Sequence, residues 1–220
     1  MADLLALDIA ILPPSDAGER AVRLSAALPK EQSQGLRLDA GHLPHITLTQ
    51  QFVRRDALDA IFARVDEVLR GQRPIPVNVG GSEKGASAVW MAVERTPAIF
   101  RLHDRLMEGL HDFEQPGGGP DAFLDGDARE GDVAWVVNYR LKSSFDFYTP
   151  HITLGHAGGP PRVEPFTFEA TTVAACHLGR FCSCRKILRT WEMGWTRPKA
   201  QSPRPRVPSQ RPTIGSGRPP

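Results

Sequence analysis

The pentapeptide Pro-His-Ile-Thr-Leu occurs twice in this chain, at Pro44–Leu48 and again at Pro150–Leu154. If each copy is an extended strand, its side chains point alternately to the two faces. The histidine and the threonine of a copy then share one face, while the isoleucine and the leucine point the other way, toward a core. If the two strands face each other, two imidazoles and two hydroxyls converge on one site that can carry out acid–base chemistry.

The bulk composition is that of a soluble globular protein. The chain has 220 residues, 40% hydrophobic and 24% charged, which suits one ordinary domain or two small lobes that share a core. No apolar run approaches the roughly 20 residues of a membrane helix, and Met1–Leu5 lacks the features of a signal peptide. Three cysteines, Cys176, Cys182 and Cys184, do not make a disulfide framework. We therefore expect a cytoplasmic protein without a membrane partner, and a monomer.

The end of the chain differs in composition from the rest. Residues 196–220 carry six basic side chains and no acidic one, and are mainly proline, arginine, serine and glycine. Residues 1–195 therefore contain 21 of the 27 basic residues and all 25 acidic residues, which gives them a net charge of −4. This charge gives no argument for nucleic acid binding. We predict a folded domain at residues 1–195 and a disordered basic tail at residues 196–220. The tail is interpreted as a solvated extension, with contacts to RNA or acidic partners as the alternative.

Apolar periodicity and turn residues predict strands and helices in alternation. We expect strands at Leu4–Leu12, from about Arg37 to Val53, and at Pro76–Val79, Ala88–Glu94, Val133–Asn138, Tyr148–Leu154, Thr167–Ala175 and Leu188–Gly194. We expect helices from Ser15 or Asp16 to about Leu28, from a cap at Asp56 to Gly71, and from Thr96 to Leu110, and an exposed, mobile loop at Gln115–Asp132. Two related α+β lobes that face each other across a pseudo-twofold axis would bring the two motif copies together.

Two copies of the motif carry more weight than one. A single histidine on an apolar strand is more often a structural residue than a catalytic one. Here His45 and His151 occupy the same step of the same pattern, and the chain has only seven histidines. Together with Thr47 and Thr153, they favour one shared site.

On His45–Leu48 and His151–Leu154 the chain resembles the 2H phosphoesterase superfamily, whose hallmark is two His-x-Thr-x motifs. Within it, the chain is most similar to the branch of 2′-5′ RNA ligases and cyclic phosphodiesterases, over about Leu4 to Met193. The resemblance implies a bilobal, pseudo-twofold α+β fold with antiparallel sheets lining a central cleft and helices outside. It also implies a phosphoesterase without metal or cofactor that acts on 2′,3′-cyclic phosphates or 2′-5′ linkages of RNA ends, or on small cyclic nucleotides.

The residue types suit this chemistry. Opening a cyclic phosphodiester needs a base for the attacking water and an acid for the departing ribose oxygen, and His45 and His151 can divide these roles. Free imidazole titrates near pH 6.5, so one ring can be neutral while the other is charged. Thr47 and Thr153 can donate hydrogen bonds to the non-bridging phosphate oxygens. Pseudo-symmetry leaves open which histidine is the base.

The sequence departs from this branch beside the motifs. Ligase-like members often carry a basic residue shortly after a motif, whereas here Thr49–Gln51 and Gly155-His156 follow. The residues that could supply the missing charge are Arg140, Lys142 and Arg185, with solvated surface charge as the alternative. The aromatic residues that could stack on a base are Phe52, Trp90 and Tyr148, with core packing as the alternative.

Three other readings of the site compete with hydrolysis. A zinc enzyme could use His151 with His156, or His177 with the three cysteines, but no paired Cys-x-x-Cys supports it, and we predict no metal. A binding module for RNA or nucleotides could keep the site without turnover, although all four motif residues are present. Ligation is the reverse of 2′-5′ hydrolysis at the same site, so the sequence does not separate the two directions.

Overall fold

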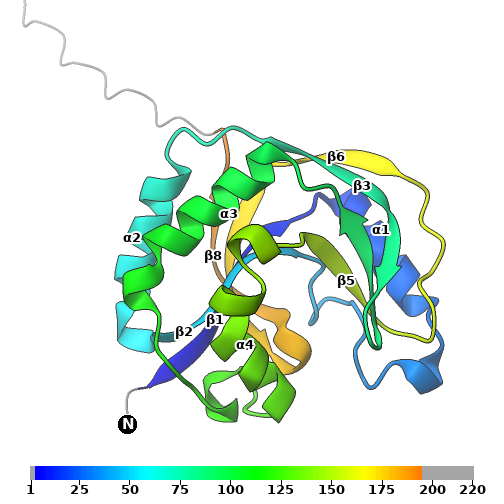
Figure 1. Cartoon of the computed structure of the whole chain (residues 1–220), viewed down its shortest axis with the longest axis horizontal. Coiled ribbons are helices and arrows are strands. Elements are labelled where there is room, and N and C mark those ends of the chain that lie inside the picture. Colours follow the sequence, from blue (N-terminus) through cyan, green and yellow to red (C-terminus); the bar gives the residue numbers. More distant parts are fainter. Residues whose placement is uncertain (1–2, 195–220) are drawn as a thin grey trace, which may run out of the picture.

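The computed structural model describes residues 3–194, which form two antiparallel β-sheets with helices packed around them (Figure 1). The predicted disordered tail at residues 196–220 lies outside the described residues. Within the described range, the structure contains no helix that is both long and apolar enough to cross a membrane.

Strands and helices follow one another in the order β1, α1, β2, α2, β3, β4, α3, α4, β5, β6, β7, β8. The strands are β1 Leu4–Leu12, β2 Ile46–Arg54, β3 Ile75–Lys84, β4 Ala88–Val93, β5 His151–His156, β6 Phe166–Ala170, β7 Thr172–Gly179 and β8 Ser183–Glu192. The helices are α1 Ser15–Ala26, α2 Leu58–Leu69, α3 Pro97–Gly109 and α4 Glu130–Lys142.

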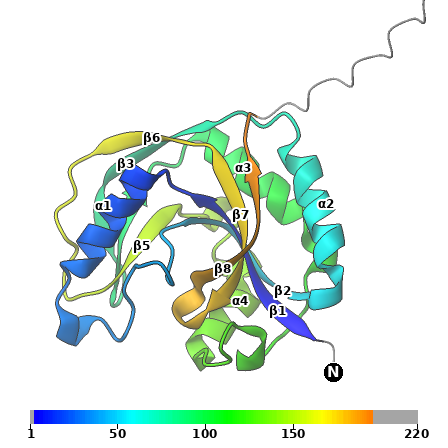
Figure 2. The same ribbon diagram turned by 180° about the vertical axis from the view of Figure 1, so that it is seen from behind.

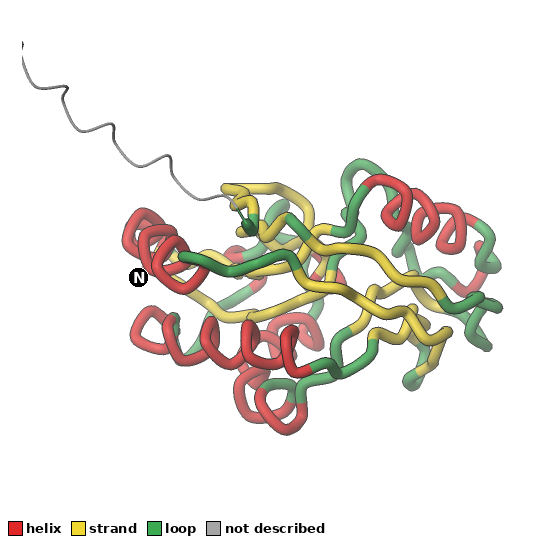
Figure 3. Tube along the Cα trace, turned by 90° about the horizontal axis from the view of Figure 1, so that it is seen from above, coloured by secondary structure: helices red, strands yellow, loops and turns green. Residues whose placement is uncertain are grey.

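Each sheet carries one copy of the motif on an edge strand. The first sheet has the strand order β2-β1-β7-β8, and the second has the order β5-β4-β3-β6. The two edge strands that hold the motif, β2 and β5, contact each other where the sheets meet. Seen from above, the helices lie outside the strands (Figure 3). The predicted α+β class with antiparallel sheets is confirmed.

The two halves of the chain are interlocked. The helix α1 follows a strand of the first sheet but packs against β5 of the second sheet, whereas α2 and α3 pack side by side, with α3 against β2 (Figure 2). After the second sheet is complete, the chain returns to the first sheet with β7 and β8. One large hydrophobic core therefore includes buried residues of both sheets, such as Leu7 of β1 and Met91 of β4.

The apolar residues of the motif point into this core, as the alternation of the sequence predicts. Ile46, Leu48, Ile152 and Leu154 are all fully buried. Burial of a side chain of this size contributes roughly 1.5–3 kcal/mol. The same four residues therefore fix which face of each strand the histidine and the threonine occupy.

Each motif leucine is also the extra residue of a β-bulge. Along β2, the neighbouring strand β1 pairs with Thr49 and then with Thr47, so Leu48 has no partner on β1. Along β5, the register with β4 skips Leu154 in the same way. A bulge bends the strand and changes which side chains share a face. The repeat in sequence is therefore also a repeat in backbone geometry.

The prediction of a strand at Val133–Asn138 is wrong, because these residues lie in α4. The helix begins where the Asp132 carboxylate accepts the backbone N–H and the guanidinium of Arg129. Val136 turns into the core while its neighbours on both sides are exposed. Apolar residues on the exposed face hide the helical period, so the run of valines resembles a strand.

Other boundaries also differ from the predictions. Asp56 forms an ion pair with Arg54 and does not cap α2. The Gln115–Asp132 segment is not an exposed loop throughout, because Phe123 is buried within it. The strand predicted at Thr167–Ala175 consists of two strands, β6 and β7. The start predicted for the third helix is confirmed, and the Thr96 hydroxyl caps this helix by accepting a backbone N–H of the first turn.

Candidate active site

The two motif histidines are held in the same way by the backbone. His45 directly precedes β2, which begins later than predicted, and His151 is the first residue of β5. Nδ1 of His45 lies 2.8 Å from the carbonyl oxygen of Leu43, and Nδ1 of His151 lies 2.7 Å from that of Thr149. A carbonyl oxygen only accepts hydrogen bonds, so Nδ1 of each ring carries a hydrogen. In both neutral rings, Nε2 keeps a lone pair that can take up a proton.

The two imidazoles lie within electrostatic reach of each other. Burial lowers the pKa of His151, and the charge of His45 lowers this pKa further, while the hydrogen bond to the Thr149 carbonyl and the charge of Glu83 oppose the shift. A histidine with a lowered pKa is neutral at physiological pH. His151 is therefore in the form that can accept a proton.

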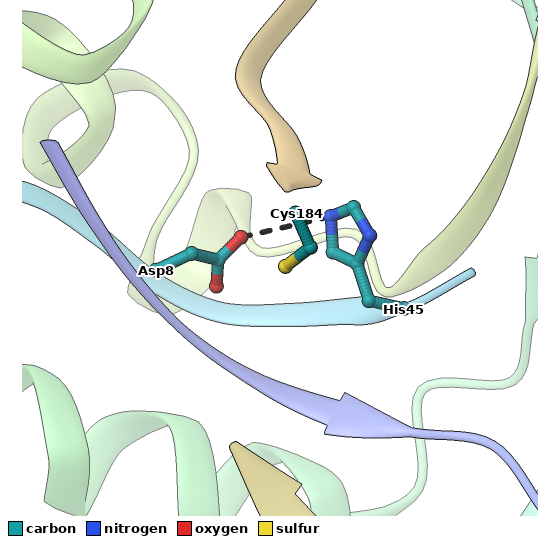
Figure 4. Close-up of side chains that lie close together, drawn as sticks. All are labelled: Asp8, His45 and Cys184. Atoms are coloured by element: carbon teal, nitrogen blue, oxygen red, sulfur yellow. Dashed lines mark ion pairs between the residues drawn. The ribbon is translucent and has the colours of Figure 1, made fainter. Parts of the chain in front are cut away.

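A buried carboxylate beside His45 is the main feature that the sequence prediction missed. Asp8 of β1 is fully buried, and its Oδ2 accepts hydrogen bonds from Thr47 Oγ1 and Gln50 Nε2, each at 2.9 Å. The same oxygen lies 3.6 Å from Nε2 of His45 (Figure 4). Burial raises the pKa of Asp8, and the charge of His45 and the two hydrogen bonds partly offset the rise. The sequence does contain a signal for Asp8, because an acidic residue is unusual in an otherwise apolar strand.

The bulge at Leu48 explains why two side chains of β2 reach this carboxylate. Thr47 and Gln50 are three residues apart and would point to opposite faces of a regular strand. Asp8 pairs with Gln50 across the sheet, and the bulged residue turns Thr47 to the same side. The bulge in the motif strand thus places two hydrogen-bond donors beside the Asp8 carboxylate.

The hydrogen bond to Asp8 makes the two motif threonines unequal. A hydroxyl has one hydrogen to donate, and Thr47 donates it to Asp8. Thr47 must release this bond before it can donate to a phosphate oxygen. Thr153, which pairs with Trp90 of β4 in the second sheet, lies in a different environment.

Among the three predicted stacking residues, Trp90 is the one beside a motif histidine. Its ring centroid lies 5.2 Å from that of His151, with the planes tilted by 44°. The indole is partly exposed. A base bound next to the imidazole could therefore contact this ring.

The rings of Phe52 and Tyr148 do not fit the predicted role of a stacking surface, because both are buried. Phe52 is 1% exposed and packs edge to face against Phe123. Tyr148 is 2% exposed, stacks on the ring of His103, and donates its hydroxyl to the Thr47 carbonyl at 2.8 Å. Phe52 therefore belongs to the core, and Tyr148 holds the first motif strand in place.

The predicted basic residues are engaged elsewhere or exposed. Arg140 forms an ion pair with Glu114 and donates to a backbone carbonyl of α3. Arg185 lies 3.3 Å from Asp125, and Lys142 is exposed on the last turn of α4. These contacts give Arg140 and Arg185 structural roles and do not place a positive charge at the motifs.

The structure does not bring together the zinc ligands considered from the sequence. His156 makes a hydrogen bond to Ser87, and Nε2 of His177 is bonded to the Ala122 carbonyl. Neither joins a group of three potential ligands within residues 3–194. The group of three potential ligands that these residues do form consists of Asp8, His45 and Cys184.

The structure thus defines an α+β protein in which two His-x-Thr strands meet at the edges of two antiparallel sheets. A family model for the 2′-5′ RNA ligase superfamily matches residues 13–177, which is well over half of the chain. The chain belongs to this superfamily and is a 2H phosphoesterase, as the paired motifs indicate. The family supports a phosphoesterase-type activity.

Solved structures of low sequence identity share the fold. A structure described as a phosphoesterase is 17% identical, covers 86% of this chain and 98% of its own, and has a TM-score of 0.56. LigT of E. coli, complexed with 3′-AMP, is 17% identical, covers 88% of this chain and 100% of its own, and has a TM-score of 0.54. TT0787 of Thermus thermophilus is 15% identical, with coverages of 86% and 98% and a TM-score of 0.52. No curated protein matches the chain.

Proposed function

We propose that this chain is a metal-independent phosphodiesterase that hydrolyses 2′,3′-cyclic phosphates or 2′-5′ bonds of RNA ends or nucleotides. His45 and His151 are its acid–base pair. The observation that supports this most strongly is that matching backbone carbonyls hold Nδ1 of both imidazoles and leave both Nε2 atoms to exchange protons. Membership of the 2′-5′ RNA ligase superfamily agrees with this reaction class.

Hydrolysis of a cyclic phosphate needs two proton transfers at phosphorus. His151 accepts a proton from water as the new P–O bond forms, and His45 donates a proton to the ribose oxygen as its bond to phosphorus breaks. The surroundings agree with this order, because burial lowers the pKa of His151, whereas Oδ2 of Asp8 lies 3.6 Å from Nε2 of His45. Proton exchange with solvent then restores both rings.

The remaining groups bind the phosphate and the base. Thr153 donates its hydroxyl to a non-bridging oxygen, where negative charge grows in the transition state. Thr47 does the same once it turns away from Asp8. The partly exposed ring of Trp90 stacks on the base of the substrate, an interaction that tolerates different bases. The complex of E. coli LigT with 3′-AMP supports a nucleotide as the kind of ligand.

The test is a substrate panel in the presence of a strong chelator. It contains nucleoside 2′,3′-cyclic phosphates, 2′-5′ oligonucleotides and ADP-ribose 1″,2″-cyclic phosphate, and the product is identified as a 2′- or a 3′-phosphate. We expect His45→Ala and His151→Ala each to lower kcat by about 10²- to 10⁴-fold while substrate binding stays within a few-fold.

His111→Ala is the matched control, because this histidine has a side chain that is 65% exposed and lies on a short turn after α3. It should keep the activity of the parent. Turnover that is equal in the parent and in both motif variants would overturn the acid–base assignment. Loss of all turnover in the chelator, with recovery on adding a metal ion, would overturn the metal-independent mechanism. Joined rather than cleaved 2′-5′ oligonucleotides would assign the site to ligation.

A further inference from the structure

We propose that Asp8, His45 and Cys184 form a zinc-binding site, and that zinc bound there inhibits the enzyme. The site itself is independent of the proposed reaction. The inhibitory effect rests on the proposed function, because zinc would occupy the nitrogen of His45 that has to transfer a proton.

The three side chains come from three different strands and converge on one point. Asp8 lies on β1, His45 just before β2 and Cys184 on β8, and their ligand atoms lie within 4.8 Å of one another (Figure 4). Oδ2 of Asp8 lies 3.6 Å from Nε2 of His45. In a tetrahedral zinc site with bonds of about 2.0–2.3 Å, ligand atoms are about 3.3–3.8 Å apart. The distance between Asp8 and His45 falls within this range, and side-chain rotation would bring the Cys184 sulfur, which lies within 4.8 Å, into it.

The groups behind the three ligands are already arranged as in protein metal sites. A histidine that binds a metal usually donates its other ring N–H to a carbonyl or carboxylate, and the Leu43 carbonyl accepts Nδ1–H of His45. The carboxylate of a metal site is usually hydrogen-bonded as well, and Thr47 and Gln50 donate to Asp8. The backbone N–H of Leu43 donates to the Cys184 carbonyl at 2.9 Å. One residue thus fixes the imidazole and holds β8 beside it.

An unpartnered acceptor gives a second, independent indication of a cation. Oδ1 of Asp8 is buried and has no hydrogen-bond donor among residues 3–194, although the residue is fully enclosed. A buried carboxylate oxygen without a donor is unfavourable, and a bound cation compensates for it. Zinc bound by the Asp8 carboxyl group would supply that cation.

The donor set selects zinc over the common divalent ions. Magnesium and calcium prefer oxygen ligands, whereas a nitrogen, a sulfur and an oxygen together suit zinc. When zinc binds, the Cys184 thiol loses its proton to solvent and a zinc–sulfur bond forms. The thiolate and the Asp8 carboxylate then carry two negative charges that balance the two positive charges of the ion. A neutral site of this kind is compatible with burial.

Bound zinc would stop the proposed reaction by a simple competition. A lone pair on Nε2 of His45 binds either a proton or the metal, so a zinc-bound ring has no proton to donate to the leaving oxygen. With three protein ligands, the fourth position of the ion stays open to water or to a phosphate oxygen. Zinc should therefore hold the enzyme in an inactive form that a chelator reverses.

Direct binding is tested first, with the full chain and with Zn²⁺ in competition with a chromophoric chelator. We expect one zinc per chain in the parent, and at least a roughly 100-fold weaker affinity in Cys184→Ser and in Asp8→Asn, because removing a ligand costs more than removing a supporting partner. Binding of Co²⁺ should give a thiolate-to-cobalt absorption band that Cys184→Ser lacks. Circular dichroism and thermal unfolding establish that each variant is folded.

Cys182→Ser is the matched control, because this nearby cysteine is not part of the group and its Sγ contacts the Asp132 carbonyl. It should bind zinc as the parent does. Unchanged zinc affinity in Cys184→Ser would overturn the proposed site. Loss of binding in Cys176→Ser with retention in His45→Ala would place the metal between two thiols and would overturn it as well.

The activity measurement tests the inhibition. Zinc should inhibit the parent and Cys182→Ser, with recovery on adding a chelator, while Cys184→Ser keeps its basal activity and loses most of its sensitivity to zinc. Equal inhibition of Cys184→Ser, or faster turnover of the parent with zinc, would overturn the inhibitory role. If the chelated parent has no turnover, the proposed function fails, and the binding measurement still decides whether the zinc site exists.

Discussion

Replacing His103 by alanine should destabilise the protein by about 2.5–7.5 kcal/mol, a large effect for a residue outside the proposed reaction. His103 lies on α3 and is fully buried. Its Nδ1 lies 2.6 Å from the Leu48 carbonyl oxygen, and its Nε2 accepts the backbone N–H of Phe145 at 2.9 Å. Its ring stacks on Tyr148 with centroids 3.8 Å apart. This one side chain therefore joins the first motif strand to the segment that leads into the second.

The magnitude follows from the groups that alanine leaves without a partner. Leu48 is the bulged residue and has no partner on β1, so His103 supplies the bond that its carbonyl lacks there. Leaving this carbonyl and the Phe145 N–H unsatisfied costs about 1–3 kcal/mol each. Loss of the stacked pair with Tyr148 adds about 0.5–1.5 kcal/mol. The sum is a large part of the roughly 5–15 kcal/mol by which a domain is stable.

Urea denaturation measures this free energy, with the midpoint compared at an unchanged slope. His111→Ala is the control, since an exposed histidine on the surface should change stability by less than about 0.5 kcal/mol. If the free energy of unfolding falls by less than about 1 kcal/mol in His103→Ala, or by no more than in His111→Ala, the two buried hydrogen bonds stabilise the protein less than predicted.

The lowered pKa of His103 predicts how the stability of the protein depends on pH. Burial lowers the pKa of His103 below the usual 6.5, and a proton on Nε2 would face the N–H of Phe145. The folded protein then binds fewer protons than the unfolded chain between the two pKa values, so stability is complete above pH 6.5 and declines as the pH falls below it. The decline should be shallower in His103→Ala than in the parent. An equally steep decline would show that other groups cause it.

Two further predictions concern the reaction. The acidic limb of kcat/KM against pH should have its midpoint below 6.5, because burial and the charge of His45 lower the pKa of His151, the proposed base. A midpoint above 6.5 would contradict this proposed role. Tyr148→Phe should lower the free energy of unfolding in urea by about 1 kcal/mol and kcat by up to about 10-fold, because the Thr47 carbonyl loses a hydrogen bond. If both values equal those of the parent, this bond does not position the strand.

The motif strands and their faces could be predicted because alternation is a local property. Ile46 and Ile152 are fully buried, whereas the histidines before them are partly exposed, as the period of two requires. The first strand, Leu4–Leu12, was predicted with its observed bounds, because an apolar run ends at two prolines. Local patterns were sufficient for these features.

The missed features depend on contacts that are distant in the sequence. Cys184 reaches His45 only because β8 pairs with β7, which pairs with β1, and because Leu43 forms a bridge to it. Nothing near either residue in the sequence indicates this approach. The helix at Val133–Asn138 was missed for a different reason: its exposed face carries apolar residues, so the pattern has no clear period.

The duplicated motif gives the site its backbone symmetry, whereas the neighbouring strands remove its chemical symmetry. Both copies have the same bulge and the same histidine geometry. The neighbour of the first copy, β1, places the Asp8 carboxylate beside His45, whereas the neighbour of the second, β4, places the Trp90 indole beside His151. Burial lowers the pKa of His151 and favours its neutral form. The proposed division of acid and base roles therefore rests on residues outside the motif, because two copies of identical sequence have different surroundings.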